Sequence, residues 1–191
     1  CAIMGGRGGS YSRSGFLGPR GKQKTVDEVL AGSNPHYREG REWQQNCQRC
    51  IYAYEMQRRG YDVEALPRIF DGTDRLPYMY DKNGWLAVMD GAKAVDFPSR
   101  NTVQKMADQM ANWGDGARAI VRVQWKGGRS GHVFMAEQQK GGTVFMDPQT
   151  GRYVDIHAYM DQAVKGATKL VRIVNLKPTA LLEICVKKRD K

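Results

Sequence analysis

Two of the four cysteines stand three residues apart in the run NCQRC, at residues 46–50. Asn46 is a favourable N-cap residue, so the pattern predicts that Cys47 opens a helix. The unpaired amides and the positive dipole end of a helix N-terminus stabilise a thiolate. Cys47 is therefore a candidate nucleophile, although a free cysteine at such a place is also often a small buried hydrophobic residue.

A thiol nucleophile needs a base within hydrogen-bond reach and a third group that orients this base. Among the three histidines, His132 opens a predicted strand after the turn KGGRSG. If HVFMAEQ and TVFMDPQ form a hairpin with an even loop centred on QKGG, residue 132 lies opposite 149 or 151. His132, Asp147 and Gln149 then share one face at one end of the hairpin, unless a bulge in the loop shifts the register.

Other chemistry remains open for the same residues. Cys50 lies one turn after Cys47 and is expected to pack in the core. A redox pair would need a thioredoxin-like βαβ context, which the sequence does not indicate. A zinc site would have to be assembled from distant ligands, namely Cys47, Cys50, His132 and His157.

Helices are expected mainly in the first part of the chain. Thr25 and Glu28 form a capping box for a short helix that stops at Gly32. The helix that begins at Cys47 is predicted to extend to Arg59, and a third helix is predicted between residues 101 and 114. The apolar stripe of the second helix consists of Cys47, Cys50, Ile51 and Tyr54.

Short β-rich runs separated by glycines dominate the sequence beyond residue 116. ARAIVRVQW, HVFMAEQ and TVFMDPQTG predict an antiparallel meander, and KLVRIVNL adds a further strand. Helices first and sheet later is the pattern of an α+β fold. This order predicts that the helix of Cys47 packs on the sheet that carries His132.

The length of 191 residues fits one domain with a substantial core. Residues 1–24 are predicted to form a flexible linker or tail rich in Gly and Arg, and residues 25–191 the catalytic domain. The sequence starts at Cys1 rather than at a methionine, which suggests a piece of a longer polypeptide. It contains no apolar run of the length that spans a bilayer. The formal charge of +10 makes nucleic acid an alternative partner, on electrostatic grounds alone.

Three motifs in this order resemble a known family. NCQRC at the start of a helix, SGHVFM at the start of a strand and FMDPQTG at the end of the next strand are similar to the papain-fold toxin domains of bacterial polymorphic toxin systems, the glutamine deamidase type. The resemblance covers residues 34–155. It implies a papain-like fold, with Cys47 as nucleophile, His132 as base and Asp147 as the residue that orients His132, while Gln149 supports this triad or replaces Asp147.

The resemblance also implies a function. We expect a toxin or effector that converts a glutamine of a target-cell protein into glutamate through a thioester, without metal or organic cofactor. It implies delivery into a target cell's cytoplasm as the C-terminal part of a larger bacterial protein, and a cognate immunity protein. A papain-like cysteine protease is an alternative, because hydrolysis of a peptide bond and of a glutamine side chain follows the same steps and differs only in the leaving group. A basic nucleic-acid-binding or virion-associated module without catalysis is the alternative from another class.

The sequence departs from papain-type proteases at the oxyanion hole. Their glutamine lies six residues before the nucleophile, where this chain has Arg41. Gln44, Gln45 or Asn46 is expected to substitute, together with the backbone amide of Cys47.

Overall fold

Most helical segments precede the main sheet along the chain. The computed structural model describes residues 16–81, 84–128 and 130–190. The elements, in chain order, are α2 (Val26–Gly32), η1 (Tyr37–Glu39), α3 (Arg41–Gln44), α4 (Cys47–Arg58), β1 (Val63–Ala65), η2 (Gly84–Val88), β2 (Ala94–Phe97), α5 (Thr102–Trp113), β3 (Arg118–Gln124), β4 (Gly131–Gln139), β5 (Gly142–Asp147), β6 (Arg152–Tyr153), α6 (Ile156–Asp161), β7 (Thr168–Arg172), η3 (Ala180–Ile184) and β8 (Val186–Lys188). The predicted capping box of Thr25 and Glu28 is present at the start of α2.

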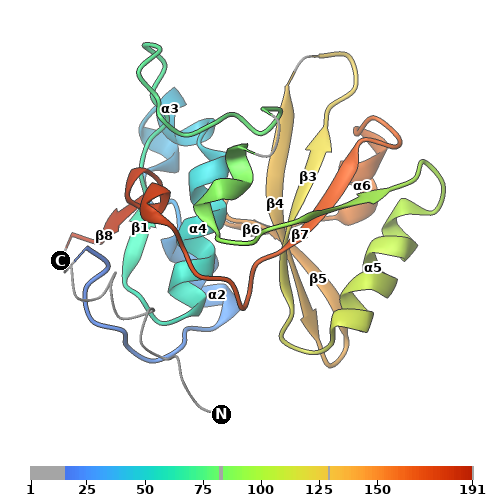
Figure 1. Ribbon diagram of the computed structural model, residues 1–191, viewed down its shortest axis with the longest axis horizontal. Coiled ribbons are helices and arrows are strands. Elements are labelled where there is room, and N and C mark those ends of the chain that lie inside the picture. Colours follow the sequence, from blue (N-terminus) through green and yellow to red (C-terminus); the bar gives the residue numbers. More distant parts are fainter. Residues whose placement is uncertain (1–15, 82–83, 129, 191) are drawn as a thin grey trace.

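The main sheet has the strand order β2-β7-β3-β4-β5-β6. Neighbouring strands are antiparallel throughout, so the predicted meander of β3, β4 and β5 is confirmed. Strands β1 and β8 form a separate antiparallel pair in the helical lobe. Figure 1 shows this lobe, with α2, α3 and α4, beside one face of the sheet, and α5 beside the other.

Helix α4 lies between the sheet on one side and α2 with the β1–β8 pair on the other, which makes it the most buried helix in the chain's described part. Its apolar residues Ile51 and Tyr54 share a core with Val133, Met135 and Met146 of the sheet. The sequence predicted one buried stripe, but every residue from Cys47 to Gln57 is buried. The predicted buried stripe was too narrow. The β1–β8 pair and the loop after β1 cover the sides of α4 that a surface helix would expose to solvent.

The opposite face of the sheet packs on α5. Met106 and Met110 of this helix lie in a second core with Val121, Phe134 and Phe145. Side chains alternate along β4, so Val133 and Met135 face α4 while Phe134 faces α5. Helix α5 ends one residue before Gly114, as its glycine stop signal predicted.

The packed part of the chain begins earlier than predicted. Leu17 is 2% exposed and belongs to the core beside α4. The amide of Gly21 donates to the carbonyl of Gly60 at 2.8 Å, and Arg20 Nε donates to the carbonyl of Arg59 at 2.8 Å. The boundary at residue 24 is therefore corrected, because one apolar side chain and the end of α4 hold this segment. The rest of the predicted tail, residues 1–15, lies outside the described residues.

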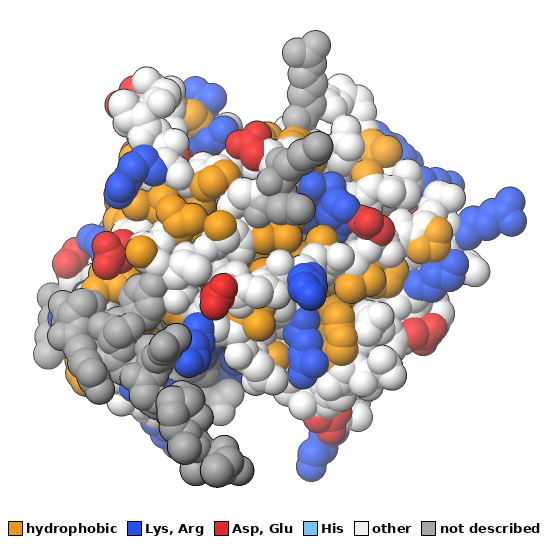
Figure 2. Space-filling model, viewed as in Figure 1, with side chains coloured by type: hydrophobic (Ala, Val, Ile, Leu, Met, Phe, Trp, Pro, Cys, Tyr) orange, Lys and Arg blue, Asp and Glu red, His pale blue; other side chains and the backbone are white. Residues whose placement is uncertain are grey.

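Among the described residues, no helix combines the length and the apolar character that crossing a bilayer requires. On the face drawn in Figure 2, Lys and Arg side chains are scattered over both lobes rather than gathered in one band. A nucleic-acid interface usually has such a band.

Candidate active site

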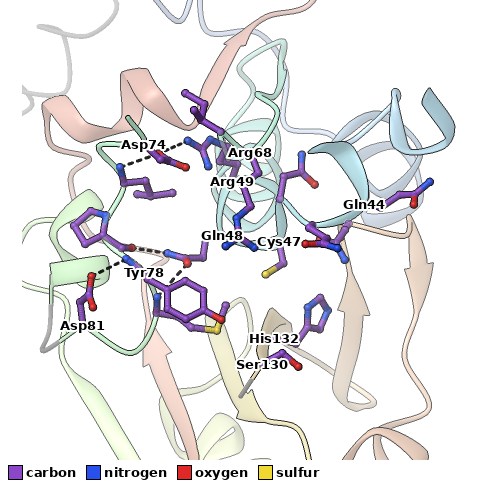
Figure 3. A pocket seen from close by; sticks show the side chains of 18 of the residues that line it. Gln44, Cys47, Gln48, Arg49, Arg68, Asp74, Tyr78, Asp81, Ser130 and His132 are labelled. Atoms are coloured by element: carbon purple, nitrogen blue, oxygen red, sulfur yellow. Dashed lines mark hydrogen bonds and ion pairs between the residues drawn. The ribbon is translucent and has the colours of Figure 1, made fainter. Parts of the chain in front are cut away.

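A pocket of about 710 Å³ opens where the start of α4 meets the start of β4. Its walls are the segment 44–49, the loop 68–81, the segment 130–132 and two side chains, Trp125 and Gln149. Cys47 and His132 both line it, and Figure 3 shows the Cys47 sulfur and the His132 ring facing each other. The structure thus brings together two residues that are far apart in the sequence.

Cys47 occupies the position that the sequence predicted for it, the first residue of α4. Cys47 is 8% exposed and lines the pocket. The first backbone hydrogen bond of the helix runs from Arg49 to Asn46, so the amides of Cys47 and Gln48 precede the bonded ladder. Such amides can bind a negative charge that develops at the sulfur or at an attacked carbonyl.

His132 is buried and bound to Asp147. Its Nε2 donates a hydrogen bond to Asp147 Oδ2 at 2.6 Å, which leaves Nδ1 for Cys47. Burial lowers the pKa of His132, but the charge of Asp147, their hydrogen bond and the neighbouring Cys47 outweigh burial and raise the pKa to about 10. The imidazole can therefore hold a proton at neutral pH beside the sulfur.

The contact between His132 and Asp147 follows from the hairpin register. Met135 pairs with Met146, and Gln139 pairs with Gly142, so the turn has two residues and no bulge. Continued past Met135, this register sets Asp147 two positions from the point opposite His132, on the same face. The predicted even loop is confirmed by the strand pairing, and it makes the two side chains diagonal neighbours.

Asp147 has two further hydrogen-bond donors. Tyr159 of α6 donates its hydroxyl to Asp147 Oδ2 at 2.9 Å, and the amide of Gln149 donates to Oδ1 at 3.0 Å. Gln149 therefore supports Asp147 through its backbone, while its side chain lines the pocket. Gln149 Oε1 is buried without a hydrogen-bond partner. Between the two orienting residues that the sequence left open, Asp147 makes the contact with His132.

Three aromatic side chains surround the His132 ring. Trp125 stacks on it with ring centroids 5.9 Å apart, Phe134 lies at 6.0 Å, and Tyr159 at 6.2 Å. Sequence reasoning missed Trp125 and Tyr159. The alternation of side chains along β4 places Phe134 on the same face as His132. The position of Trp125, just before the turn KGGRSG that leads to His132, was the one sequence feature that could have indicated Trp125. Nothing local pointed to Tyr159, because α6 reaches the site only through packing.

Asn46 is a correction to the predicted oxyanion group. Its Nδ2 donates to Asn34 Oδ1 at 3.1 Å and to the carbonyl of Leu66 at 3.0 Å, so both amide hydrogens are used. Asn46 also does not cap α4 with its side chain. Asn46 ties the segment after α2 and the segment after β1 to the start of α4. The exposed Gln45 lines the pocket, and its side-chain amide is the remaining candidate donor to a bound substrate.

Cys50 packs in the core beside α4's other buried residues, as predicted. It is fully buried, and its thiol donates to Asn46 Oδ1 at 3.1 Å. Burial, followed by the charges of Cys47 and Asp147, raises the pKa of Cys50 well above its usual value. Within the described residues, no group of three or more His, Cys, Asp or Glu side chains could hold a metal ion.

A helical lobe whose buried central helix starts with a cysteine, packed against an antiparallel sheet that carries a histidine, is the arrangement of a papain-like fold. A family model described as papain fold toxin 1, glutamine deamidase, matches residues 45–152. The chain belongs to this family, as its motifs suggested, and the match includes Cys47, His132 and Asp147. No curated protein and no solved structure matched the chain.

Proposed function

We propose that this chain deamidates a glutamine side chain of a target-cell protein, with Cys47 as nucleophile, His132 as proton carrier and Asp147 as the residue that orients His132. One observation carries the proposal. Cys47 faces His132 at the start of a buried helix, and the other nitrogen of His132 is bound to Asp147 at 2.6 Å. Family membership names the amide as the bond that is hydrolysed.

The first half of the reaction forms a thioester. The Cys47 sulfur attacks the side-chain carbonyl carbon of glutamine, and the carbonyl electron pair moves to oxygen. His132, protonated at Nδ1, gives its proton to the amide nitrogen as the carbon–nitrogen bond breaks. Ammonia leaves, and the acyl group stays on Cys47.

The second half hydrolyses the thioester. Neutral His132 removes a proton from water, and the water oxygen attacks the acyl carbon. The carbon–sulfur bond then breaks, so that Cys47 regains its electron pair and the product is a glutamate side chain. Both steps pass through an oxyanion, for which the Cys47 amide and the Gln45 side chain are the proposed donors.

The biological setting is part of the proposal. A toxin domain acts on a target protein, and we infer delivery into the cytoplasm of a target cell as the C-terminal part of a larger bacterial protein. An uncontrolled deamidase would harm the cell that makes it. A cognate immunity protein is therefore expected, and co-purification from the producing cell would identify it.

Peptide mass spectrometry tests the reaction. A cell lysate is incubated with the full chain or with its Cys47→Ala variant, and peptides are scored for conversion of glutamine into glutamate and for new chain ends. We expect site-specific conversion that only the wild-type chain produces. New chain ends that depend on Cys47 would instead identify a protease, and no Cys47-dependent change in several lysates would contradict both reactions.

A further inference from the structure

The loop 66–81 exposes an apolar pair beside the pocket. Ile69 and Phe70 are each 43% exposed, and Tyr153 is the other large hydrophobic side chain with comparable exposure among the described residues. Ile69 lines the pocket itself. In Figure 1 the first part of this loop projects next to α3, and its later part runs toward the sheet. Two adjacent exposed apolar side chains at the mouth of a pocket are a typical feature of a binding surface.

The loop is held in place by the start of α4. The side chain of Gln48 donates to the carbonyl of Pro77 at 2.9 Å and accepts from the amide of Met79 at 3.1 Å. Arg49 is paired with Asp74 at 2.7 Å. On the other side of the apolar pair, the amide of Arg68 donates to the carbonyl of Glu42 at 2.9 Å. The loop is therefore anchored on both sides of Ile69 and Phe70 before anything binds, which reduces the entropy lost on binding.

Arginines flank the apolar pair. The guanidinium of Arg41 lies 4.2 Å from the centre of the Phe70 ring, and that of Arg68 lies 5.0 Å from it. Arg75 is exposed and lines the pocket together with Arg68. Considering only residues the structure describes, no carboxylate lies within 4.0 Å of these three guanidinium groups. Their hydrogen-bonding edges remain available to an anionic partner.

We propose that this rim patch, formed by Arg41, Arg68, Ile69, Phe70 and Arg75, binds the segment of the target protein that flanks the modified glutamine. The segment carries an apolar side chain that covers Ile69 and Phe70, and a carboxylate that pairs with the arginines. This inference rests on the proposed function, because that function makes a protein the substrate.

Continuity with the pocket favours this occupant. A glutamine whose side chain reaches Cys47 brings its own main chain across the pocket mouth, where Ile69 and Arg68 lie. Residues next to that glutamine must then cover the rim patch. A nucleic acid would also suit the arginines, but its phosphates offer nothing that buries Ile69.

Fluorescent peptides that contain one glutamine test the surface. In one set, Leu and Asp are placed in turn at the three positions on either side of the glutamine, and in the other Ser and Lys replace them. Each peptide is titrated against the full chain carrying Cys47→Ala, with fluorescence anisotropy as the readout. We expect the best Leu/Asp peptide to bind at least about tenfold more tightly than its Ser/Lys counterpart.

Three variants on the Cys47→Ala background locate the binding. Ile69→Ser combined with Phe70→Ser, and separately Arg75→Gln, should each reduce the tenfold preference. Tyr153→Ser removes an exposed aromatic side chain outside the patch and should retain it. The exposure of Ile69, Phe70 and Arg75 predicts unchanged folding, which circular dichroism checks.

The results separate this inference from the proposed reaction. Equal binding of the two peptide sets, binding that survives the patch variants, or no binding at all would each overturn the docking surface. Patch-dependent binding of a single-stranded oligonucleotide in place of the peptides would overturn it as well. Conversion of the bound peptide into its glutamate form by the chain with an intact Cys47 tests the deamidase reaction independently of where the peptide docks.

Discussion

The two ends of helix α4 hold two clusters of ionisable groups that differ in how completely they are paired. At the C-terminal end, Arg118 binds Glu55 through two hydrogen bonds of 2.7 and 3.0 Å, and Arg59 binds the same carboxylate at 2.8 Å. Arg58 and the hydroxyl of Tyr54 satisfy Glu137 of β4 in the same way. A pocket of about 390 Å³ lies beside this cluster and is lined by Arg58, Arg59 and Arg118, but each buried charge of the cluster has its partner.

At the N-terminal end of α4, the polar groups are not all paired. His132 has one nitrogen bound to Asp147, and its other nitrogen faces Cys47 across a pocket of about 710 Å³. Gln149 Oε1 is buried there without a hydrogen-bond partner. Buried charges alone therefore do not mark a reactive site. What distinguishes the proposed site is a thiol beside the second ring nitrogen of a histidine that is bound to Asp147, both lining the pocket.

The largest expected effect is loss of activity in Cys47→Ala. Removing the nucleophile should lower ammonia release from a glutamine peptide by roughly 10⁶-fold. The free energy of unfolding should change by less than about 1 kcal/mol, because only one small atom is removed and the hydrogen bond between His132 and Asp147 remains. Urea titration and an ammonia assay on the same preparations measure both. Residual activity near the wild-type level would remove Cys47 from the mechanism.

Glu55→Gln, at the other end of α4, should lower the free energy of unfolding. Loss of the carboxylate leaves Arg118 and Arg59 without their partner in a buried place, which should cost about 3–5 kcal/mol in urea titration. The control is Asp96→Asn, which breaks an exposed pair with Lys169 and should cost less than about 1 kcal/mol. Equal costs for the two variants would contradict the structural role assigned to the Glu55 cluster.

Asp147→Asn should weaken proton transfer while leaving the pocket intact. It should lower kcat roughly 10³-fold, because His132 loses the charge and the acceptor that orient it. It should also lower the pKa of His132 from about 10, so the alkaline limb of the pH–rate profile moves to lower pH. Asp108→Asn on the exposed side of α5 is the matched control. An unmoved alkaline limb would exclude His132 as the titrating group.

The same shift predicts how stability depends on pH. His132 has a folded pKa of about 10, above the ordinary value of 6.5, so its contribution is fully present below pH 6.5 and is lost as pH rises through 10. Part of the fall in unfolding free energy between these pH values should therefore disappear in Asp147→Asn. Urea titrations of both chains at several pH values measure the difference.

The smallest expected effect is on kcat, and it should differ between two neighbouring glutamines that line the pocket, Gln45 and Gln44. Gln45→Ala should lower kcat about 10²-fold if its amide binds the oxyanion. Gln44→Ala, an exposed residue one position earlier that also lines the pocket, should stay within about threefold of wild type. A similar loss in both variants would argue for a general effect on the start of α4 instead.

The residues proposed for the chemistry could be chosen from the sequence because their placement depends on short-range rules. The amphipathic spacing and glycine stop of α5 fixed its bounds within a residue. The two-residue turn between β4 and β5 fixed the register, and with it the neighbourhood of His132 and Asp147. An N-cap residue before an apolar run was enough to place Cys47 at the start of a helix.

Features that failed or were missed depend on contacts between distant segments. Asn46 was expected to cap α4 or to bind an oxyanion, but its Oδ1 accepts from the thiol of Cys50, and its Nδ2 donates to Asn34 and to the carbonyl of Leu66. Leu17 was assigned to a tail because its neighbours are Gly, Ser and basic residues. Its side chain is nevertheless buried, and hydrogen bonds from Arg20 and Gly21 hold this segment against the end of α4. Composition averages over a segment, whereas packing is decided by individual side chains.

The sequence by itself predicted helices α2, α4 and α5, the meander of β3, β4 and β5, and the candidates Cys47 and His132, since periodicity, capping and turn length act over a few residues. It left Asp147 and Gln149 open as the orienting residue. Only the tertiary structure decided that the start of α4 meets the open end of the β4–β5 hairpin. It also decided that Tyr159 joins Asp147, and that Ile69 and Phe70 stand at the pocket mouth. These contacts arise when two lobes bury apolar surface against each other, which no local pattern in the chain records.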